Sequence, residues 1–107
     1  MTTVGSGEIA RQAWSIHVCG TVQGVGFRPF VHRVATGLGL DGNVRNVDGD
    51  VFIEAAGSPA ALDALTRALR SEAPPHAVVR QVAVTRTVAT APATGAGFAV
   101  LTSGSRT

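Results

Sequence analysis

The chain has 107 residues, enough for one domain, and 45% of them are hydrophobic and 15% charged, which is typical of a globular protein. All nine basic residues are arginine, and the formal net charge of +2 is too small for a nucleic-acid surface. The single cysteine excludes an internal disulfide, and no apolar stretch or signal pattern indicates a membrane or secreted protein. We therefore expect a cytoplasmic protein with no membrane or nucleic-acid partner.

The N-terminal part of the chain contains a lead-in, a strand and a glycine-bearing loop. Residues 1–13 mix Gly, Ser and Thr without a period, so we expect them to be flexible. Residues 15–22 alternate in polarity, which predicts a half-buried strand with His17 and Cys19 on one side. After the loop, Pro29 indicates the first turn of a helix, where a missing amide donor costs little.

The first predicted helix has an apolar face and a glycine stop. Gly39 follows its last apolar residue and suits the left-handed position just after a helix. The spacing of the apolar residues predicts that this helix packs against the sheet. They are Phe27, Val31, Val34 and Leu38.

A hairpin and a second helix follow. An Asp-Gly pair at positions 48–49 separates two strand-like runs, residues 43–47 and 51–56, and predicts a tight hairpin. Ser58 and Pro59 then predict the N-cap and the first position of a second helix.

The remaining elements complete a known pattern. A Pro-Pro pair at 74–75 ends the second helix, and residues 78–88 and 98–101 are strand candidates. The order β-α-β-β-α-β with a short final strand is the ferredoxin-like, split βαβ pattern of the α+β class. It predicts an antiparallel sheet with both helices on one face. We place this domain at residues 14–101 and interpret 102–107 as a polar tail or the beginning of a linker.

The loop between the first strand and the first helix is the main candidate for chemistry. Gly24 and Gly26 permit backbone angles that let successive amides converge on an anion. The helix start adds N–H donors and a favourable dipole, and Arg28 adds a planar cationic group. The spacing matches neither a P-loop nor a dinucleotide fingerprint, and an isolated Gly-x-Gly is more often a plain turn beside a surface arginine.

Two segments resemble the acylphosphatase family. Residues 20–28, Gly-Thr-Val-Gln-Gly-Val-Gly-Phe-Arg, resemble its signature, and residues 42–46, Gly-Asn-Val-Arg-Asn, resemble its second element. The resemblance covers about residues 15–101. It implies that Arg28 and Asn46 are catalytic, with Arg28 holding the phosphate and Asn46 orienting the attacking water. It also implies a phosphate-binding loop formed by Gln23, Gly24, Val25, Gly26, Phe27 and Arg28.

Two positions depart from the pattern of that family. Thr21 stands where many members have arginine, and Asn43 stands where tryptophan is common. We expect the first change to weaken the positive field at the loop and the second to remove an aromatic wall near Asn46.

One branch of the superfamily fits best. Residues 27–31, Phe-Arg-Pro-Phe-Val, and the later Pro-Pro pair are similar to the N-terminal domain of the hydrogenase-maturation carbamoyltransferase (HypF) family. This resemblance implies that the chain is part of a larger carbamoyltransferase whose other domains are its partners. The substrate would be carbamoyl phosphate, split into carbamate and phosphate. Because a substrate phosphate oxygen can accept the proton of the water, no histidine or carboxylate has to act as base. We expect no cofactor and no metal in this domain.

Two alternatives stay open at this point. The chain could be a free-standing acylphosphatase that acts on generic acyl phosphates, or a non-catalytic module that binds inorganic phosphate and docks to other domains. Phosphate binding without turnover would indicate the second alternative.

The other polar residues are weaker candidates. His17 and Cys19 are too few ligands for a metal site, and we expect them on the helix-free face of the sheet, where further domains could dock. Asp48 and Asp50 flank the hairpin turn and are expected to serve the turn. The same open face is expected to lack the aromatic side chains that RNA binding would need.

Overall fold

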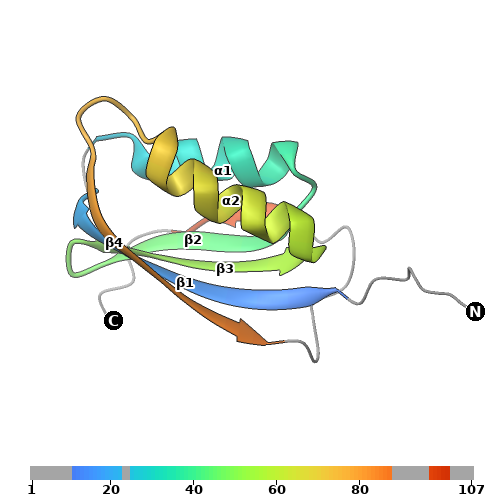
Figure 1. Ribbon diagram of the computed structural model, residues 1–107. Helices are drawn as coiled ribbons and strands as arrows, with labels where there is room; N and C mark the ends of the chain where they lie inside the picture. The colour runs from blue at the N-terminus through green and yellow to red at the C-terminus, as the bar shows by residue number, and fades with distance from the viewer. Residues whose placement is uncertain (1–10, 23–24, 88–96, 102–107) are drawn as a thin grey trace, which may run out of the picture.

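A computed structural model describes residues 11–22, 25–87 and 97–101, and it shows one sheet covered by two helices (Figure 1). The predicted α+β, ferredoxin-like order is confirmed, with one short strand added at the end. The elements are β1 (Gln12–Thr21), α1 (Phe27–Gly37), β2 (Asp41–Val47), β3 (Asp50–Gly57), α2 (Pro59–Ser71), β4 (Val78–Thr87) and β5 (Phe98–Val100).

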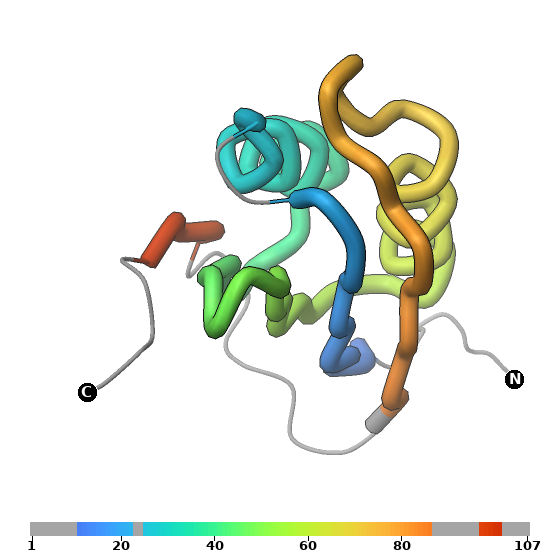
Figure 2. Tube along the Cα trace, turned by 90° about the vertical axis from the view of Figure 1, so that its left-hand side faces the viewer, coloured from blue at the N-terminus to red at the C-terminus, as the bar shows by residue number. Residues whose placement is uncertain are grey.

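The five strands lie in the order β4-β1-β3-β2-β5. All pairs are antiparallel except β2 with β5, which run parallel, so the predicted antiparallel sheet is correct for four strands and wrong for the fifth. Figure 2 shows β5 at the edge opposite to β4. β5 runs in the opposite direction to β4 and in the same direction as β2. The amide of Leu101 extends this pairing by donating to the carbonyl of Val44 at 2.8 Å.

The register of the sheet aligns one row of residues across four strands. Val18 pairs with Val82 on one side and with Val51 on the other, and Val51 pairs with Asn46. Directly paired residues point to the same face of a sheet. Val18 and Val51 are buried in the core beneath the helices, so Asn46 is the polar member of an otherwise apolar row.

Both helices begin and end where local chemistry predicts. The Ser58 hydroxyl accepts a hydrogen bond from the amide of Ala61 at 3.1 Å, and Pro59 occupies the first turn of α2. Gly39, with φ of 73°, follows the C-cap of α1 in the left-handed conformation. The predicted apolar face of α1 is rotated slightly, since Val34 and Leu38 are only partly buried. Its buried residues are Phe27, Phe30, Val31 and Ala35.

The β2–β3 hairpin is confirmed as a tight turn. Asp48 and Gly49 both have positive φ, 53° and 88°, which is the backbone of the turn that Asp-Gly favours. Within the described residues, no helix is long and apolar enough to cross a bilayer.

The helix-free face carries His17 and Cys19 as predicted, but it also carries an aromatic residue. Phe52 pairs with His17 across β1 and β3, and the two rings stack with centroids 4.2 Å apart. The expectation that this face lacks aromatic residues is therefore wrong, because Phe52 alternates with the buried Val51 and Ile53 along β3.

Gly20 marks the β-bulge where β1 changes register against β4. Its φ is 139°, and an added Cβ would lie 1.9 Å from the carbonyl oxygen of Val78.

Gly20→Ala should therefore lower the free energy of unfolding by at least about 2 kcal/mol in urea denaturation. Gly37→Ala is the matched control, because a Cβ there meets nothing within 4 Å. The control should be neutral or stabilising by up to about 1 kcal/mol. Equal effects of the two variants would contradict this role of Gly20.

Candidate functional site

The beginning of α1 offers backbone N–H donors and the positive end of a helix. Gly26 is the N-cap residue in the left-handed conformation, with φ of 80° and ψ of 19°, and no side chain caps the helix. The first turn contains no acidic residue. The amides of Phe27 and Arg28 occupy the first two helical positions, where N–H groups lack partners within the helix. The partial positive charge at a helix start of this kind favours an anion.

Arg28 lies in the first turn of α1 and is half-buried. Its Nη1 donates a hydrogen bond to the backbone carbonyl of Leu101 at 3.1 Å. The Leu101 amide in turn bonds to Val44 of β2, so the final segment connects the arginine to the sheet. The sequence did not predict this contact, because its partner is a backbone carbonyl 73 positions away.

Asn46 lies on β2 with its side chain in the core, 3% exposed. Its Oδ1 atom is buried and has no hydrogen-bond partner within the described part of the chain. Leaving a buried acceptor unpaired typically costs about 1–3 kcal/mol, so a polar ligand that donates a hydrogen bond to this oxygen would be favoured. Such an oxygen is suited to accept a hydrogen bond from a small polar ligand such as water.

The helix start and Asn46 lie at the same end of the molecule. β1 ends at Thr21, close to the row that contains Val18 and Asn46, and α1 begins after the loop that follows. Figure 1 shows the end of β1, the beginning of α1 and the β2–β3 hairpin together at one end of the sheet. Since α1 also packs against β2, the fold brings the two predicted catalytic residues to one region.

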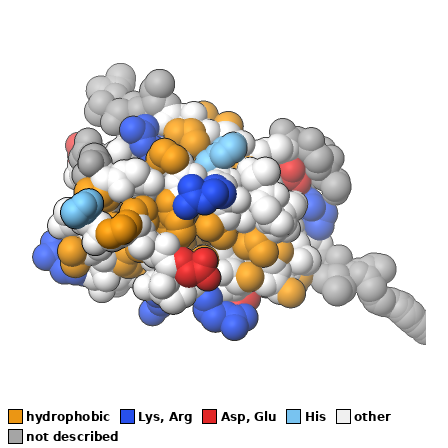
Figure 3. Space-filling model, turned by 90° about the horizontal axis from the view of Figure 1, so that it is seen from above, with side chains coloured by type: hydrophobic (Ala, Val, Ile, Leu, Met, Phe, Trp, Pro, Cys, Tyr) orange, Lys and Arg blue, Asp and Glu red, His pale blue; other side chains and the backbone are white. Residues whose placement is uncertain are grey.

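The predicted phosphate-binding loop is only partly described. Gln23 and Gly24 lie outside the described residues. Val25 packs partly buried against the core, and the Phe27 side chain is 1% exposed, so Phe27 can offer a ligand only its backbone. The face that carries the helices shows separate basic and acidic side chains rather than one continuous basic surface (Figure 3).

The two residues that depart from the family pattern, Thr21 and Asn43, lie in different places relative to the candidate site. Thr21 is exposed at the end of β1, beside the loop. Asn43 pairs with Glu54, whose side chain bonds Ser15 on the helix-free face. Because Asn43 is three residues from Asn46 on one strand, the two side chains point to opposite faces. The expectation that an aromatic wall near Asn46 is lost is therefore wrong.

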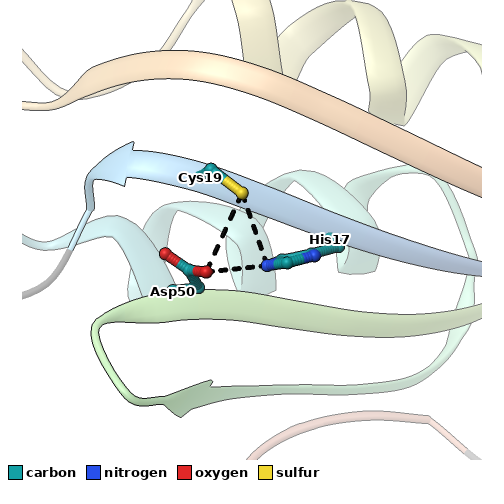
Figure 4. Close-up of side chains that lie close together, drawn as sticks. All are labelled: His17, Cys19 and Asp50. Atoms are coloured by element: carbon teal, nitrogen blue, oxygen red, sulfur yellow. Dashed lines mark hydrogen bonds and ion pairs between the residues drawn. The ribbon is translucent and has the colours of Figure 1, made fainter.

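A second group of polar side chains lies on the helix-free face of the sheet. His17 and Cys19 of β1 and Asp50 of β3 point toward one another (Figure 4). The His17 Nε2 atom lies 2.8 Å from Oδ2 of Asp50, and the Cys19 Sγ atom lies 3.4 Å from that nitrogen. Partial burial raises the pKa of the Cys19 thiol, and the charge and hydrogen bond of Asp50 raise it further, while Arg80 acts in the opposite sense.

The sequence predicts only a turn role for Asp50, whereas the structure also places its carboxylate beside His17 and Cys19. Its place could have been found from the hairpin and the strand alternation together. Asp50 directly follows a two-residue turn, and its neighbour Val51 pairs with Val18, so Asp50 must lie near Cys19. Asp48, by contrast, serves the turn as expected.

Comparisons with known proteins show to which family the sequence and the fold are similar. The model of the acylphosphatase family matches residues 14–100. Over 88 residues the chain is 53% identical to carbamoyltransferase HypF2 of Cupriavidus necator, which covers 82% of this chain and 11% of that protein. The acylphosphatase structure from Bacillus subtilis has a TM-score of 0.75 and 35% identity, covering 84% of this chain and 98% of that one.

A full-length HypF structure in a phosphate- and nucleotide-bound form has a TM-score of 0.79 and 29% identity, covering 89% of this chain and 12% of that one. The chain thus spans about a tenth of these carbamoyltransferases but nearly all of the single-domain acylphosphatase.

The unpaired oxygen of Asn46 has a consequence for stability. Asn46→Leu keeps the number of side-chain heavy atoms and removes the buried unpaired acceptor, so the free energy of unfolding should rise by about 1 kcal/mol. Urea denaturation monitored by circular dichroism measures the change. A loss of stability of similar size would show that the amide of Asn46 makes structural bonds that the fold needs.

Proposed function

Because the chain belongs to the acylphosphatase family, as the match over residues 14–100 shows, we propose that it hydrolyses an acyl phosphate, with carbamoyl phosphate as its substrate. The observation that carries this proposal is the position of the uncapped α1 start and Arg28 at the same end of the sheet as the unpaired Oδ1 of Asn46. One group binds an anion, and the other accepts a hydrogen bond.

The phosphate of the substrate binds at the beginning of α1. The amides of Phe27 and Arg28 donate to its oxygens, and the guanidinium of Arg28 adds a charge-assisted contact. The bond from Arg28 to the Leu101 carbonyl holds the guanidinium near β5, which limits the freedom that binding must remove. Positioning and charge stabilisation are the main contributions that a protein makes to phosphoryl transfer.

Asn46 orients the nucleophile. Its Oδ1 accepts a hydrogen bond from a water molecule, whose oxygen forms a bond to phosphorus. The bond between phosphorus and the acyl oxygen breaks, and carbamate leaves with the electron pair. The proton of the water passes to a phosphate oxygen. The first turn of α1 contains no carboxylate that would serve as base, which agrees with a substrate-assisted step.

The choice of carbamoyl phosphate rests on the relatives. The chain is 53% identical to a stretch of Cupriavidus necator carbamoyltransferase HypF2, and residues 27–31 read Phe-Arg-Pro-Phe-Val. In this proposal the domain supplies carbamate to further domains of a cytoplasmic carbamoyltransferase for [NiFe]-hydrogenase maturation. A free-standing acylphosphatase is the second candidate, because the chain also covers 98% of the Bacillus subtilis acylphosphatase.

Phosphate release from carbamoyl phosphate, compared with benzoyl phosphate, tests the proposal. Arg28→Ala should lower kcat/KM by at least about 100-fold and weaken competitive inhibition by inorganic phosphate. The matched control is Arg33→Ala, which removes an exposed arginine that contacts the Phe30 ring on the same helix and should change turnover by less than about twofold.

Asn46→Leu separates the two roles in the same assay. It should abolish turnover but leave inhibition by phosphate within about threefold of wild type, because the anion is held by other groups. A preference for benzoyl phosphate would favour the free-standing alternative. Phosphate binding without turnover of either substrate would overturn the hydrolase proposal and indicate a binding module.

A further inference from the structure

We propose that His17, Cys19 and Asp50 form a binding site for a divalent transition metal, with Zn²⁺ as the ion that their donor atoms favour. The site lies on the helix-free face of the sheet, opposite to the proposed phosphate site, and it does not depend on the proposed hydrolysis. Each residue offers one ligand atom, and these atoms all lie within 4.8 Å of one another.

The spacing of the three donors is close to one face of a coordination tetrahedron. With Zn–S of about 2.3 Å and Zn–N and Zn–O of about 2.1 Å, tetrahedral angles place sulfur about 3.6 Å from either light atom and nitrogen about 3.4 Å from oxygen. The Sγ atom of Cys19 lies 3.4 Å from His17 Nε2 and 3.8 Å from Asp50 Oδ2. The distance of 2.8 Å between His17 Nε2 and Asp50 Oδ2 is that of a hydrogen bond. It must increase by only about 0.6 Å for both atoms to bind the same zinc ion.

The backbone beneath the cluster is held firmly. The cluster spans the adjacent strands β1 and β3, whose register is fixed by the pair of Val18 with Val51 between the ligands. The His17 ring stacks on Phe52 at an interplanar angle of 15°, which limits its rotation. Ligands on paired strands with one ring restrained lose little freedom on binding a metal.

The donor set selects among metals. A thiolate, an imidazole and a carboxylate suit Zn²⁺ and Co²⁺, whereas Mg²⁺ and Ca²⁺ require oxygen ligands. The thiolate and the carboxylate together neutralise a divalent charge, and the proton of the Cys19 thiol leaves to solvent when the metal–sulfur bond forms. Arg80 lies near enough to influence Cys19 and opposes the cation in part.

Solvent can reach the cluster, so a metal has an entry path and a fourth ligand position. The side chains of His17 and Asp50 are 39% and 37% exposed. A shallow cleft of about 290 Å³ adjoins His17 and is bordered by Ser15, Phe52 and Glu54, among others. Three protein ligands with one position open to water or to a group from a partner is a known arrangement for zinc.

Cobalt provides the test, because Cys19 is the only cysteine of the 107-residue chain. Titration of that chain with Co²⁺ should give a saturable charge-transfer absorption from a thiolate–cobalt bond, and Zn²⁺ should abolish it by displacement. Cys19→Ser should remove the band. His17→Gln and Asp50→Asn should each weaken Co²⁺ binding by about tenfold or more.

His76→Gln is the matched control, because it removes an imidazole from an exposed residue of the segment between α2 and β4. Its Co²⁺ affinity should equal that of wild type. Absence of the band in wild type, or a band of unchanged affinity in both His17→Gln and Asp50→Asn, would overturn the proposed site. Circular dichroism of each variant shows whether it is folded, and the conservative Asp50→Asn keeps the test decisive if another variant unfolds.

Cobalt binding at the metal site can be tested separately from anion binding at the proposed phosphate site. Arg28→Ala should bind Co²⁺ as wild type does, because Arg28 belongs to the start of α1 and none of the three ligands contacts it in the described structure. Loss of the cobalt band in Arg28→Ala would contradict two independent sites.

Discussion

The register of the three strands β1, β3 and β2 is the constraint on which both candidate sites depend. It sets Val18 beside Val51 and Val51 beside Asn46, so the asparagine enters the core in the row of Val18, three residues before β1 ends at Thr21. A shift by one residue would move Asn46 to the open face and bring Arg45 or Val47 to its place, depending on the direction of the shift. The apolar residues of that row, buried beneath the helices, make such a shift expensive, and they thereby hold a polar acceptor where hydrogen-bond partners are few.

The alternation of side chains gives the two faces of these strands different chemistry. On the helix side, an arginine and a helix start favour an anion, and Asn46 supplies an acceptor. On the open side, His17, Cys19 and Asp50 combine soft and hard donors that favour a cation. Apolar core side chains of the strands separate the two sites, so a substitution at one site makes no direct contact with the other. The chain spans about a tenth of the carbamoyltransferases that it resembles.

Local signals predicted most of the fold. Ser58 with Pro59, the Asp-Gly turn and Gly39 each act over a few residues, and all three lie where the sequence placed them. Long-range geometry was harder to predict. The parallel pairing of β5 and the bond from Arg28 to Leu101 join segments far apart in the chain. The role of Asp50 and the face of Asn43 required the strand register, which composition and motif spacing do not contain.

Titration of the ¹⁵N-labelled chain with inorganic phosphate, followed by NMR, would show whether an anion binds at the beginning of α1 beside Asn46. We expect saturable shifts of the backbone amides of residues 25–28 and of the Asn46 side-chain amide, with the signals of His17 and Cys19 on the open face unchanged. Shifts confined to the open face, or no saturable shift at the start of α1, would contradict it.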